Sequence, residues 1–340
     1  MIRISKSDLR ILKALPRALN YSEISREAGF SQPYVSNKIK SMKNRFDFVF
    51  KVDFWSMSLL PLVVVTEYEP DLLRKTEKHI PYLRTIRLMY RGLKKRLLIE
   101  LLPPRDRADE VLDTLGVEPL EVYRLRFEVM WRPDKDGLAE SRDNRLVVRL
   151  ERLSEVYRKC REYREAERRI VRPDDIDMVI LWKKMDFPFI PLASIGRVLD
   201  ISQQLISYHF RHHVLSQWMY NGVRVKSFLE PAPLLFIRID VSAPRYALKL
   251  LELAMKLPYT YSAFVTYDMP KSALALLRIP CNDYSSILSQ LSKMEGLEDL
   301  EVLGLVELEP AVKSDYPFEP GALLKIFTSR SRREIRVIEV

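Results

Sequence analysis

The chain has 340 residues, of which 47% are hydrophobic and 30% are charged, the balance of a folded protein and not of a disordered one. The nine glycines form no GxGxxG or GxxxxGKS/T loop, and the two distant cysteines, Cys160 and Cys281, exclude a thiolate zinc cluster. The net charge of +10 favours a polyanionic partner. Since no apolar run reaches about 18 residues and the first residues lack a signal-peptide core, we expect a cytoplasmic protein that binds no membrane.

Residues 1–57 predict a winged helix-turn-helix domain. A first helix follows a cap at Ser7, a second spans 21–28, and a third begins after the turn at Gly29 with Ser31 as its cap. In the third helix the apolar side chains recur at helical spacing and must face inward; they are Val35, Ile39 and Met42. The alternating stretch 46–54 predicts the strands of a wing.

Residues 58–133 predict a ferredoxin-like domain with the order βαββαβ. The expected elements are a strand at 60–66, a helix at 71–80, strands at 83–90 and 96–102, a helix at 104–115 and a strand at 120–131.

Residues 134–172 predict a linker with a long helix. Its apolar residues are spaced four and three apart, namely Leu146, Leu150, Leu153, Tyr157 and Cys160. We favour a helix that packs on its own domain, because fewer than three heptads are present; a dimer seam or a rigid spacer is the alternative.

The second half repeats this order. Residues 173–229 predict a second winged helix-turn-helix, with Asp174 as the first cap, a helix at 192–199, and a third helix capped by Ser202. A wing hairpin is expected to turn at Asn221-Gly222, since Asn-Gly suits a tight hairpin turn. Residues 230–312 predict a second βαββαβ domain, and 313–340 a tail with a basic run at 330–333. The strands and helices expected in this domain are 234–241, 244–257, 259–267, 272–279, 283–294 and 300–308.

The two halves are related by a constant offset of 171 residues. Residues 31–36 read SQPYVS and 202–207 read SQQLIS, and upstream Ile24 and Arg26 match Ile195 and Arg197. The sequence therefore predicts an α+β fold made of a tandem internal repeat.

The third helix of each half is the candidate DNA reader, because Gln, Asn, Lys and Arg bind base edges and phosphates. The predicted DNA-binding residues are Gln32, Pro33, Ser36, Asn37, Lys40, Lys43, Gln203, Gln204, Ser207, Tyr208, Arg211 and His212, with Arg224 in the second wing. Residues 1–60 hold eleven Lys and Arg against five Asp and Glu, whereas 227–310 hold seven against eleven. The positive charge is thus concentrated where DNA would bind. The two candidate recognition helices carry different outward-facing residues, so they are not equivalent.

Each half resembles an Lrp/AsnC (feast/famine) transcriptional regulator of the archaeal type. The segment SEISREAGFS at 22–31 carries the resemblance, together with VFKVD at 49–53, which leads from the wing into the next domain. The resemblance implies a regulator that binds double-stranded DNA and forms oligomers through its βαββαβ domains. The family's ligand loops carry Gly and Asp, whereas the loops at 90–94 and 267–271 are poor in Gly, so a small-molecule effector is left open.

A metal site and an enzyme are alternatives to the DNA-binding regulator. His209, His212 and His213 could ligate a metal, but without a nearby Cys we expect phosphate contact and no metal. Siroheme decarboxylases share the duplicated plan, and MDFPF at 185–189 before LASI at 192–195 resembles a stretch that they carry. The resemblance implies His and Arg around an anionic tetrapyrrole, and few His are present, so we expect no enzyme, no catalytic residue and no cofactor. A replication initiator and a winged-helix protein-interaction factor are further alternatives.

Overall fold

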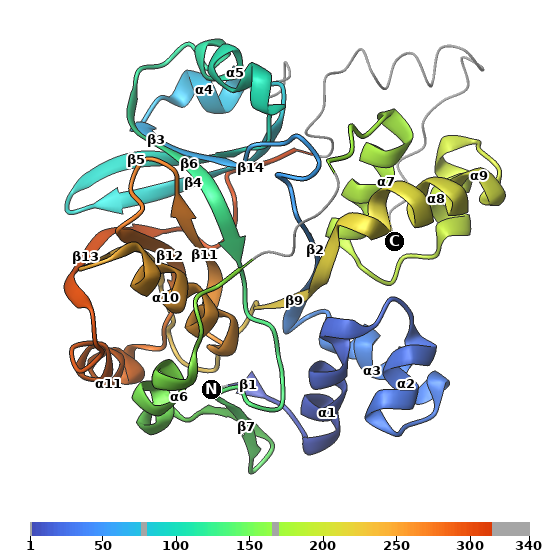
Figure 1. Cartoon of the computed structure of the whole chain (residues 1–340), viewed down its shortest axis with the longest axis horizontal. Coiled ribbons are helices and arrows are strands. Elements are labelled where there is room, and N and C mark those ends of the chain that lie inside the picture. The colour runs from blue at the N-terminus through green and yellow to red at the C-terminus, as the bar shows by residue number, and fades with distance from the viewer. Residues whose placement is uncertain (1, 76–79, 165–169, 315–340) are drawn as a thin grey trace.

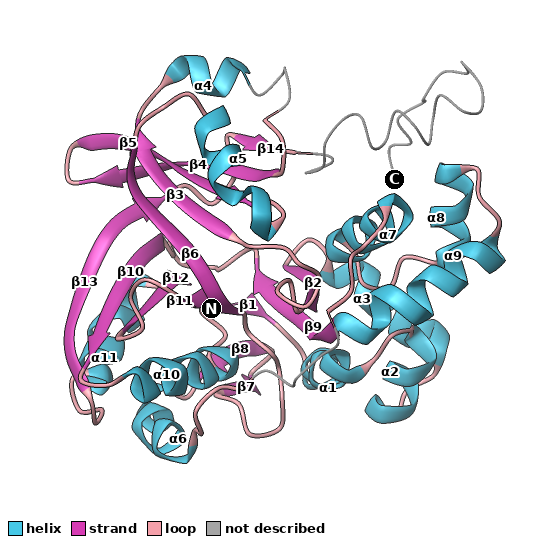
Figure 2. Cartoon of the chain, turned by 45° about the horizontal axis from the view of Figure 1, so that its top comes forward, coloured by secondary structure: helices cyan, strands magenta, loops and turns pink. Residues whose placement is uncertain are grey.

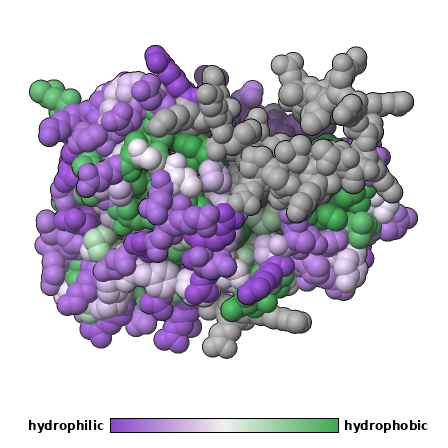
Figure 3. Space-filling view, turned by 90° about the horizontal axis from the view of Figure 1, so that it is seen from above, coloured by the Kyte–Doolittle hydropathy of each residue, from purple (hydrophilic) through white to green (hydrophobic). Residues whose placement is uncertain are grey.

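The computed structural model describes residues 2–75, 80–164 and 170–314 and has an α+β fold, which confirms the predicted class. Two groups of helices lie side by side on one side of the molecule, and most strands form one large sheet on the other (Figure 1). Among the described residues, no helix is both long enough and apolar enough to span a membrane. On the face seen in Figure 3, hydrophilic side chains predominate and the hydrophobic areas are small.

The large sheet is antiparallel and contains four strands from each half, in the order β13-β10-β12-β11-β6-β3-β5-β4, with the short β14 at its end. A further pairing of β13 with β4, through Leu305 and Tyr90, joins the two ends of the eight strands. The bounds are β3 Leu62–Glu67, β4 Leu83–Arg91, β5 Lys94–Leu101, β6 Pro119–Val129, β10 Leu234–Val241, β11 Thr260–Thr266, β12 Ser272–Arg278, β13 Leu297–Val306 and β14 Val312–Lys313.

Both faces are covered at strands such as β3 and β12, which explains why these two read as nearly continuous apolar runs. In β3, Val63 and Val65 face the inner core, and Leu62 and Val64 face the helices outside, because alternate side chains point to opposite faces. The helices on the outer faces are α4 Pro70–Lys75, α5 Ala108–Thr114, α10 Pro244–Lys256 and α11 Cys281–Leu291 (Figure 2). Each half therefore runs through its elements in the order β, α, β, β, α, β.

Each helical group has three helices. The first holds α1 Lys6–Ala14, α2 Tyr21–Ala28 and α3 Gln32–Met42, and the second holds α7 Asp175–Asp186, α8 Leu192–Leu199 and α9 Gln203–His209. Asp174 caps α7 as predicted, whereas the cap of α1 is Ser5 and not Ser7. A π-helical turn, Phe210–Val214, follows α9.

The predicted wing hairpin around Asn221-Gly222 is wrong. Both residues lie inside strand β9, Trp218–Val225, which pairs with β2, Phe46–Val52, of the other half. Phe50 pairs with Asn221, its own counterpart at the offset of 171, so the local two-fold axis passes through this pair. The buried Asn221 side chain donates to the carbonyl oxygens of Leu15 and Ala18 at 3.1 and 2.6 Å, bonds that a hairpin turn in solvent would not have.

The linker also differs from the prediction. The described part of this range, 134–164 and 170–172, contains a hairpin, β7 Ala139–Arg142 and β8 Arg145–Val148, which pairs with β1, Ile2–Arg3. Its α-helix, α6 Leu153–Lys159, is short. Leu153, Tyr157 and Cys160 are buried against α10 and α11 within the chain. The predicted long helix is wrong, since Leu146 lies in β8, but the side chains of α6 do pack within the chain and not in a dimer seam. The basic run 330–333 lies outside the described residues.

Candidate functional site

The predicted DNA-binding side chains lie mostly on the outer faces of α3 and α9. Ser36 and Ser207 are half-buried, and the exposed ones are Gln32, Pro33, Asn37, Lys40, Lys43, Gln203, Gln204, Tyr208, Arg211 and His212. Two expectations about this surface fail. His209 is buried instead of facing DNA, and Arg224 lies in a cavity behind the β2–β9 ribbon, so neither can contact a duplex there.

The cavity that receives Arg224 is the candidate site. It has a volume of about 310 Å³ and lies between the β2–β9 ribbon, the strands β4 and β5, and the last turn of α7. The segment from Leu308 to Lys313 closes one side. Its apolar and aromatic walls include Phe48, Trp182, Met185 and Tyr261.

Arg87 is the most constrained cation of the cavity. It is 3% exposed, its Nη1 donates to the backbone oxygens of Glu307 (3.3 Å) and Leu308, and its Nη2 donates to the Tyr261 hydroxyl at 2.7 Å. Its Nε is buried and has no hydrogen-bond partner among the described residues. A buried donor without a partner costs free energy, so a ligand atom that accepts from it would be stabilised.

Arg224 and Arg84 complete a group of three guanidinium groups. Arg224 lies over the ring of Tyr261 at 4.2 Å, and its Nε donates to the Tyr261 backbone oxygen at 3.1 Å. Arg87 lies against the same ring at 5.2 Å, so Tyr261 holds two arginines in place. Arg84 is 12% exposed.

One buried carboxylate, Glu100, faces the three arginines. Burial by itself would raise the pKa of Glu100, but the positive charges of Arg84 and Arg87 and a hydrogen bond from Thr85 hold this pKa below its usual value. Glu100 is therefore ionised at neutral pH, and its single charge offsets one of the three arginines.

A second buried carboxylate, Glu128, has its own partner behind the cavity. Lys51 contacts Glu128 at 2.5 Å, Ser262 donates to its other oxygen at 3.0 Å, and Arg84 lies 3.9 Å away. Burial would raise the pKa of Glu128, but Lys51 and Arg84 lower it to about 2. Lys51 thus neutralises Glu128, and Glu100 is left as the buried carboxylate that offsets one of the three arginines.

At the rim of the cavity, two ion pairs add no net charge, because each joins one lysine to one aspartate. Lys226 contacts Asp47 at 3.3 Å, and Lys313 contacts Asp186 at 3.1 Å. Glu309 is exposed at the rim. Among the described side chains that are buried or half-buried around the cavity, the three arginines exceed Glu100 by two positive charges, a balance that suits a ligand with two or more negative charges.

Charged residues within the strands are the sequence signal for this site. Arg84 and Arg87 in β4, Glu100 in β5 and Glu128 in β6 are charged residues that each have an apolar neighbour in the strand. A charge inside a strand buried on both faces must find a partner or a ligand. Which charges meet depends on the pairing of the strands, which periodicity alone does not predict.

Comparison with known proteins found no matching family model and no match among curated proteins. Two solved structures of the siroheme decarboxylase NirDL, one in co-complex with an iron-uroporphyrin III analogue, are each 10% identical. In each case the likeness extends over 95% of this chain and 98% of the NirDL chain, with a TM-score of 0.49. The structure of PH0061 is 14% identical over 37% of this chain and 95% of the other, with a TM-score of 0.28.

At 10% identity and a TM-score of 0.49, the NirDL likeness assigns neither a family nor an activity to this chain. The prediction that the chain is not an enzyme is nevertheless not upheld, because the structures found to be similar are those of a decarboxylase.

Proposed function

We propose that the chain is an enzyme that binds a small molecule with several carboxylates in the cavity of Arg84, Arg87 and Arg224. The excess of two positive charges among the buried and half-buried side chains of the cavity carries this proposal. A planar guanidinium donates two parallel hydrogen bonds to one carboxylate, so arginine binds this group better than lysine does. The free Nε of Arg87 supplies a donor that needs such an acceptor.

The ligand class that we propose is a carboxylated tetrapyrrole. The aromatic walls formed by Trp182 and Tyr261 suit a flat ring system, and the arginines suit its acidic side chains. A volume of 310 Å³ is at the lower end for a small-molecule site, so we expect one edge of the macrocycle, with its carboxylates, to enter the cavity. Met185 and Asp186, from the stretch that resembles siroheme decarboxylases, line this cavity.

The reaction that we propose is decarboxylation of an acidic side chain. The bond between the carboxyl carbon and its neighbour breaks, carbon dioxide leaves, and the electron pair left on the neighbouring carbon takes up a proton. The Tyr261 hydroxyl accepts a hydrogen bond from Arg87 and so keeps its own proton available for this donation. Water then restores the proton of Tyr261. The arginines hold the carboxylates that remain and so orient the macrocycle.

Absorption titration with iron-uroporphyrin III tests the binding step. We expect Arg87→Gln and Arg224→Gln to weaken binding at least 10-fold, and Arg211→Gln, an exposed arginine on the helical face, to leave it unchanged. Citrate and inorganic phosphate compete in separate arms, since both could occupy the arginines. Tight competition by phosphate but not by citrate would point to a phosphorylated ligand instead. Absence of binding by the parent chain would contradict the tetrapyrrole.

Turnover tests the chemical step. If Tyr261 donates the proton, Tyr261→Phe keeps the affinity within a few-fold but lowers the rate of carbon dioxide release by about 100-fold. An unchanged rate would remove Tyr261 from the chemistry without affecting the binding proposal.

Duplex DNA is a second candidate partner, favoured by the exposed polar faces of α3 and α9. Lys40 and Arg211 are exposed there at equivalent places, 171 residues apart. We expect affinity for duplex DNA to fall steeply between 50 and 200 mM salt. We also expect Lys40→Ala and Arg211→Ala each to weaken it, with no effect from Arg87→Gln. Unchanged binding in both surface variants would contradict this candidate.

A further inference from the structure

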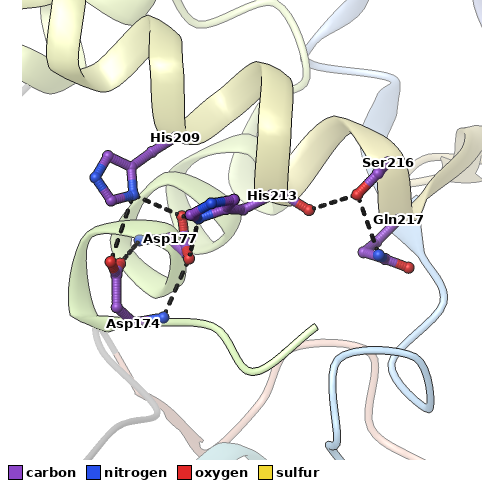
Figure 4. Close-up of polar contacts among 6 residues, drawn as sticks. All are labelled: Asp174, Asp177, His209, His213, Ser216 and Gln217. Carbon is purple, nitrogen blue, oxygen red and sulfur yellow. Dashed lines mark hydrogen bonds and ion pairs between the residues drawn. The ribbon is translucent and has the colours of Figure 1, made fainter. Parts of the chain in front are cut away.

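A second polar cluster lies away from the cavity, between the start of α7 and the end of α9. Figure 4 shows His209 and His213 pointing from one helix toward Asp174 and Asp177. The His209 Nδ1 lies 2.9 Å from one Asp177 oxygen and 3.5 Å from Asp174, and the His213 Nδ1 lies 2.9 Å from the other Asp177 oxygen. One donor atom from each of the four residues falls within 4.8 Å of the others.

The local structure explains why these side chains converge. His209 and His213 are four residues apart and so share one side of their helix. Asp174 and Asp177 cap α7 by accepting from each other's backbone N–H, which fixes both carboxylates at the helix start. Asp177 is 1% exposed, whereas the Asp174 side chain is 53% exposed, so the cluster is buried on one side and open to solvent on the other.

The first half of the chain shows what this place in the fold requires. There Asp8 takes the place of Asp177, and its partners are Lys38 at 3.0 Å and Arg45 at 3.8 Å. Lys38 is the counterpart of His209 at the offset of 171. The cap position of Asp174 is held by the uncharged Ser5.

The two halves therefore differ in charge at one site. The first half has a single carboxylate and two permanent cations. The second half has two carboxylates and two histidines, which carry no charge in their neutral form. A buried carboxylate needs a compensating positive charge, and here the chain itself supplies no permanent one within the cluster.

We propose that this cluster, Asp174, Asp177, His209 and His213, binds a divalent transition-metal ion, with zinc as the best fit. Two imidazole nitrogens and two carboxylate oxygens form a four-ligand set that suits zinc, whereas magnesium and calcium prefer oxygen alone. In a tetrahedral zinc site the ligand atoms lie roughly 3.3 Å apart. Three of the separations, 2.9, 2.9 and 3.5 Å, lie near that value, and all four donor atoms fall within 4.8 Å of one another.

The ion would join α7 to the end of α9. Asp174 and Asp177 lie at the start of α7, and Trp182, Met185 and Asp186 on the same helix line the cavity. The metal thus has a structural role, because it holds the helix that forms one wall of the cavity.

Metal content and thermal stability test the site in the full chain. The protein is stripped with a chelator, dialysed against zinc, and measured for bound metal and for Tm with and without zinc. We expect about one zinc ion per chain, a higher Tm with zinc, and the visible absorption of tetrahedral Co²⁺ when cobalt replaces it.

The variants are chosen to keep the fold. Asp174→Ser keeps a capping side chain, as Ser5 does in the first half, and His213→Gln changes a partly exposed residue. We expect each to lower zinc affinity at least 10-fold and to remove the rise in Tm. His212→Ala, the exposed neighbour, is the control and should behave as the parent. If the parent binds no zinc, or if both variants bind it as well as the parent does, the cluster is a hydrogen-bonded helix cap and the proposal is wrong.

Discussion

The two helical groups have the same plan but differ at one helix. α3 is a regular helix of 11 residues, whereas α9 has 7 residues and continues as a π-helical turn. Val35 and Ile39 match Ile206 and Phe210 at the offset of 171, but the next buried residues, Met42 and Val214, are 172 apart. A π-helical turn holds one extra residue, which accounts for this shift.

The extra residue changes the chemistry. Val214 enters the core in place of Met42, and His213, the direct counterpart of Met42, is left to face Asp177. A single residue inserted in a repeat has thus turned a core position into part of a polar cluster. In this chain the two halves differ in chemistry where the helix periodicity changes. The four predictions below test how corresponding positions of the two halves differ.

The largest effect is expected at the β2–β9 ribbon, where Lys51 in one half corresponds to Gly222 in the other. Lys51→Ala would leave Glu128 buried without its main partner, and we expect a loss of about 3–5 kcal/mol in the free energy of unfolding, measured with urea. The double variant Lys51→Ala, Glu128→Gln should regain most of it. A loss below about 1 kcal/mol in the single variant would show that Arg84 alone neutralises Glu128.

The same pair predicts a pH dependence. The pKa of Glu128 is lowered from 4.5 to about 2 in the folded protein. The stabilisation that the ionised Glu128 contributes to the free energy of unfolding is therefore fully present above pH 4.5 and is lost as the pH falls toward 2. Between pH 4.5 and pH 2, we expect the free energy of unfolding to fall by about 3 kcal/mol because of this carboxylate. The double variant Lys51→Ala, Glu128→Gln should show a smaller fall in urea unfolding over the same pH range.

A smaller effect is expected at Asp8, the counterpart of Asp177. Burial would raise the pKa of Asp8, but hydrogen bonds from Lys38 and Ser5 hold it below the usual 3.8. Lys38→Ala should lower the free energy of unfolding by about 1–3 kcal/mol at pH 7. Because the pKa is lowered in the folded state, this difference should disappear as the pH falls below 3.8. An equal loss at acid and neutral pH would mean that Lys38 acts through packing and not through charge.

The smallest effect comes from making the halves alike. His209→Lys gives the second half the cation that the first half has, and it removes one proposed zinc ligand. We expect a Tm without zinc within a few degrees of the parent's and no further rise when zinc is added. A rise equal to the parent's would show that His209 takes no part in metal binding.

Local pattern predicted much of the fold. The second helices, 21–28 and 192–199, have the predicted bounds, and strand 234–241 does as well, because periodicity and caps are local properties. The hairpin at Asn221-Gly222 failed because a tertiary contact overrode a local preference. Adding a Cβ at Gly222 would place it 2.2 Å from the Met130 sulfur, so this glycine is needed for close packing and not for a turn.

The sequence by itself determined the α+β class, the offset of 171 and the helices that carry the exposed polar faces. Only the tertiary structure decided that Arg84, Arg87 and Arg224 meet in one cavity and that two histidines meet two aspartates. In the cavity, Arg87 and Arg224 are 137 residues apart in the sequence. In the cluster, Asp177 and His209 are 32 residues apart. Helix and strand periodicity acts over a few residues, whereas sheet order and one π-helical turn bring distant charges together.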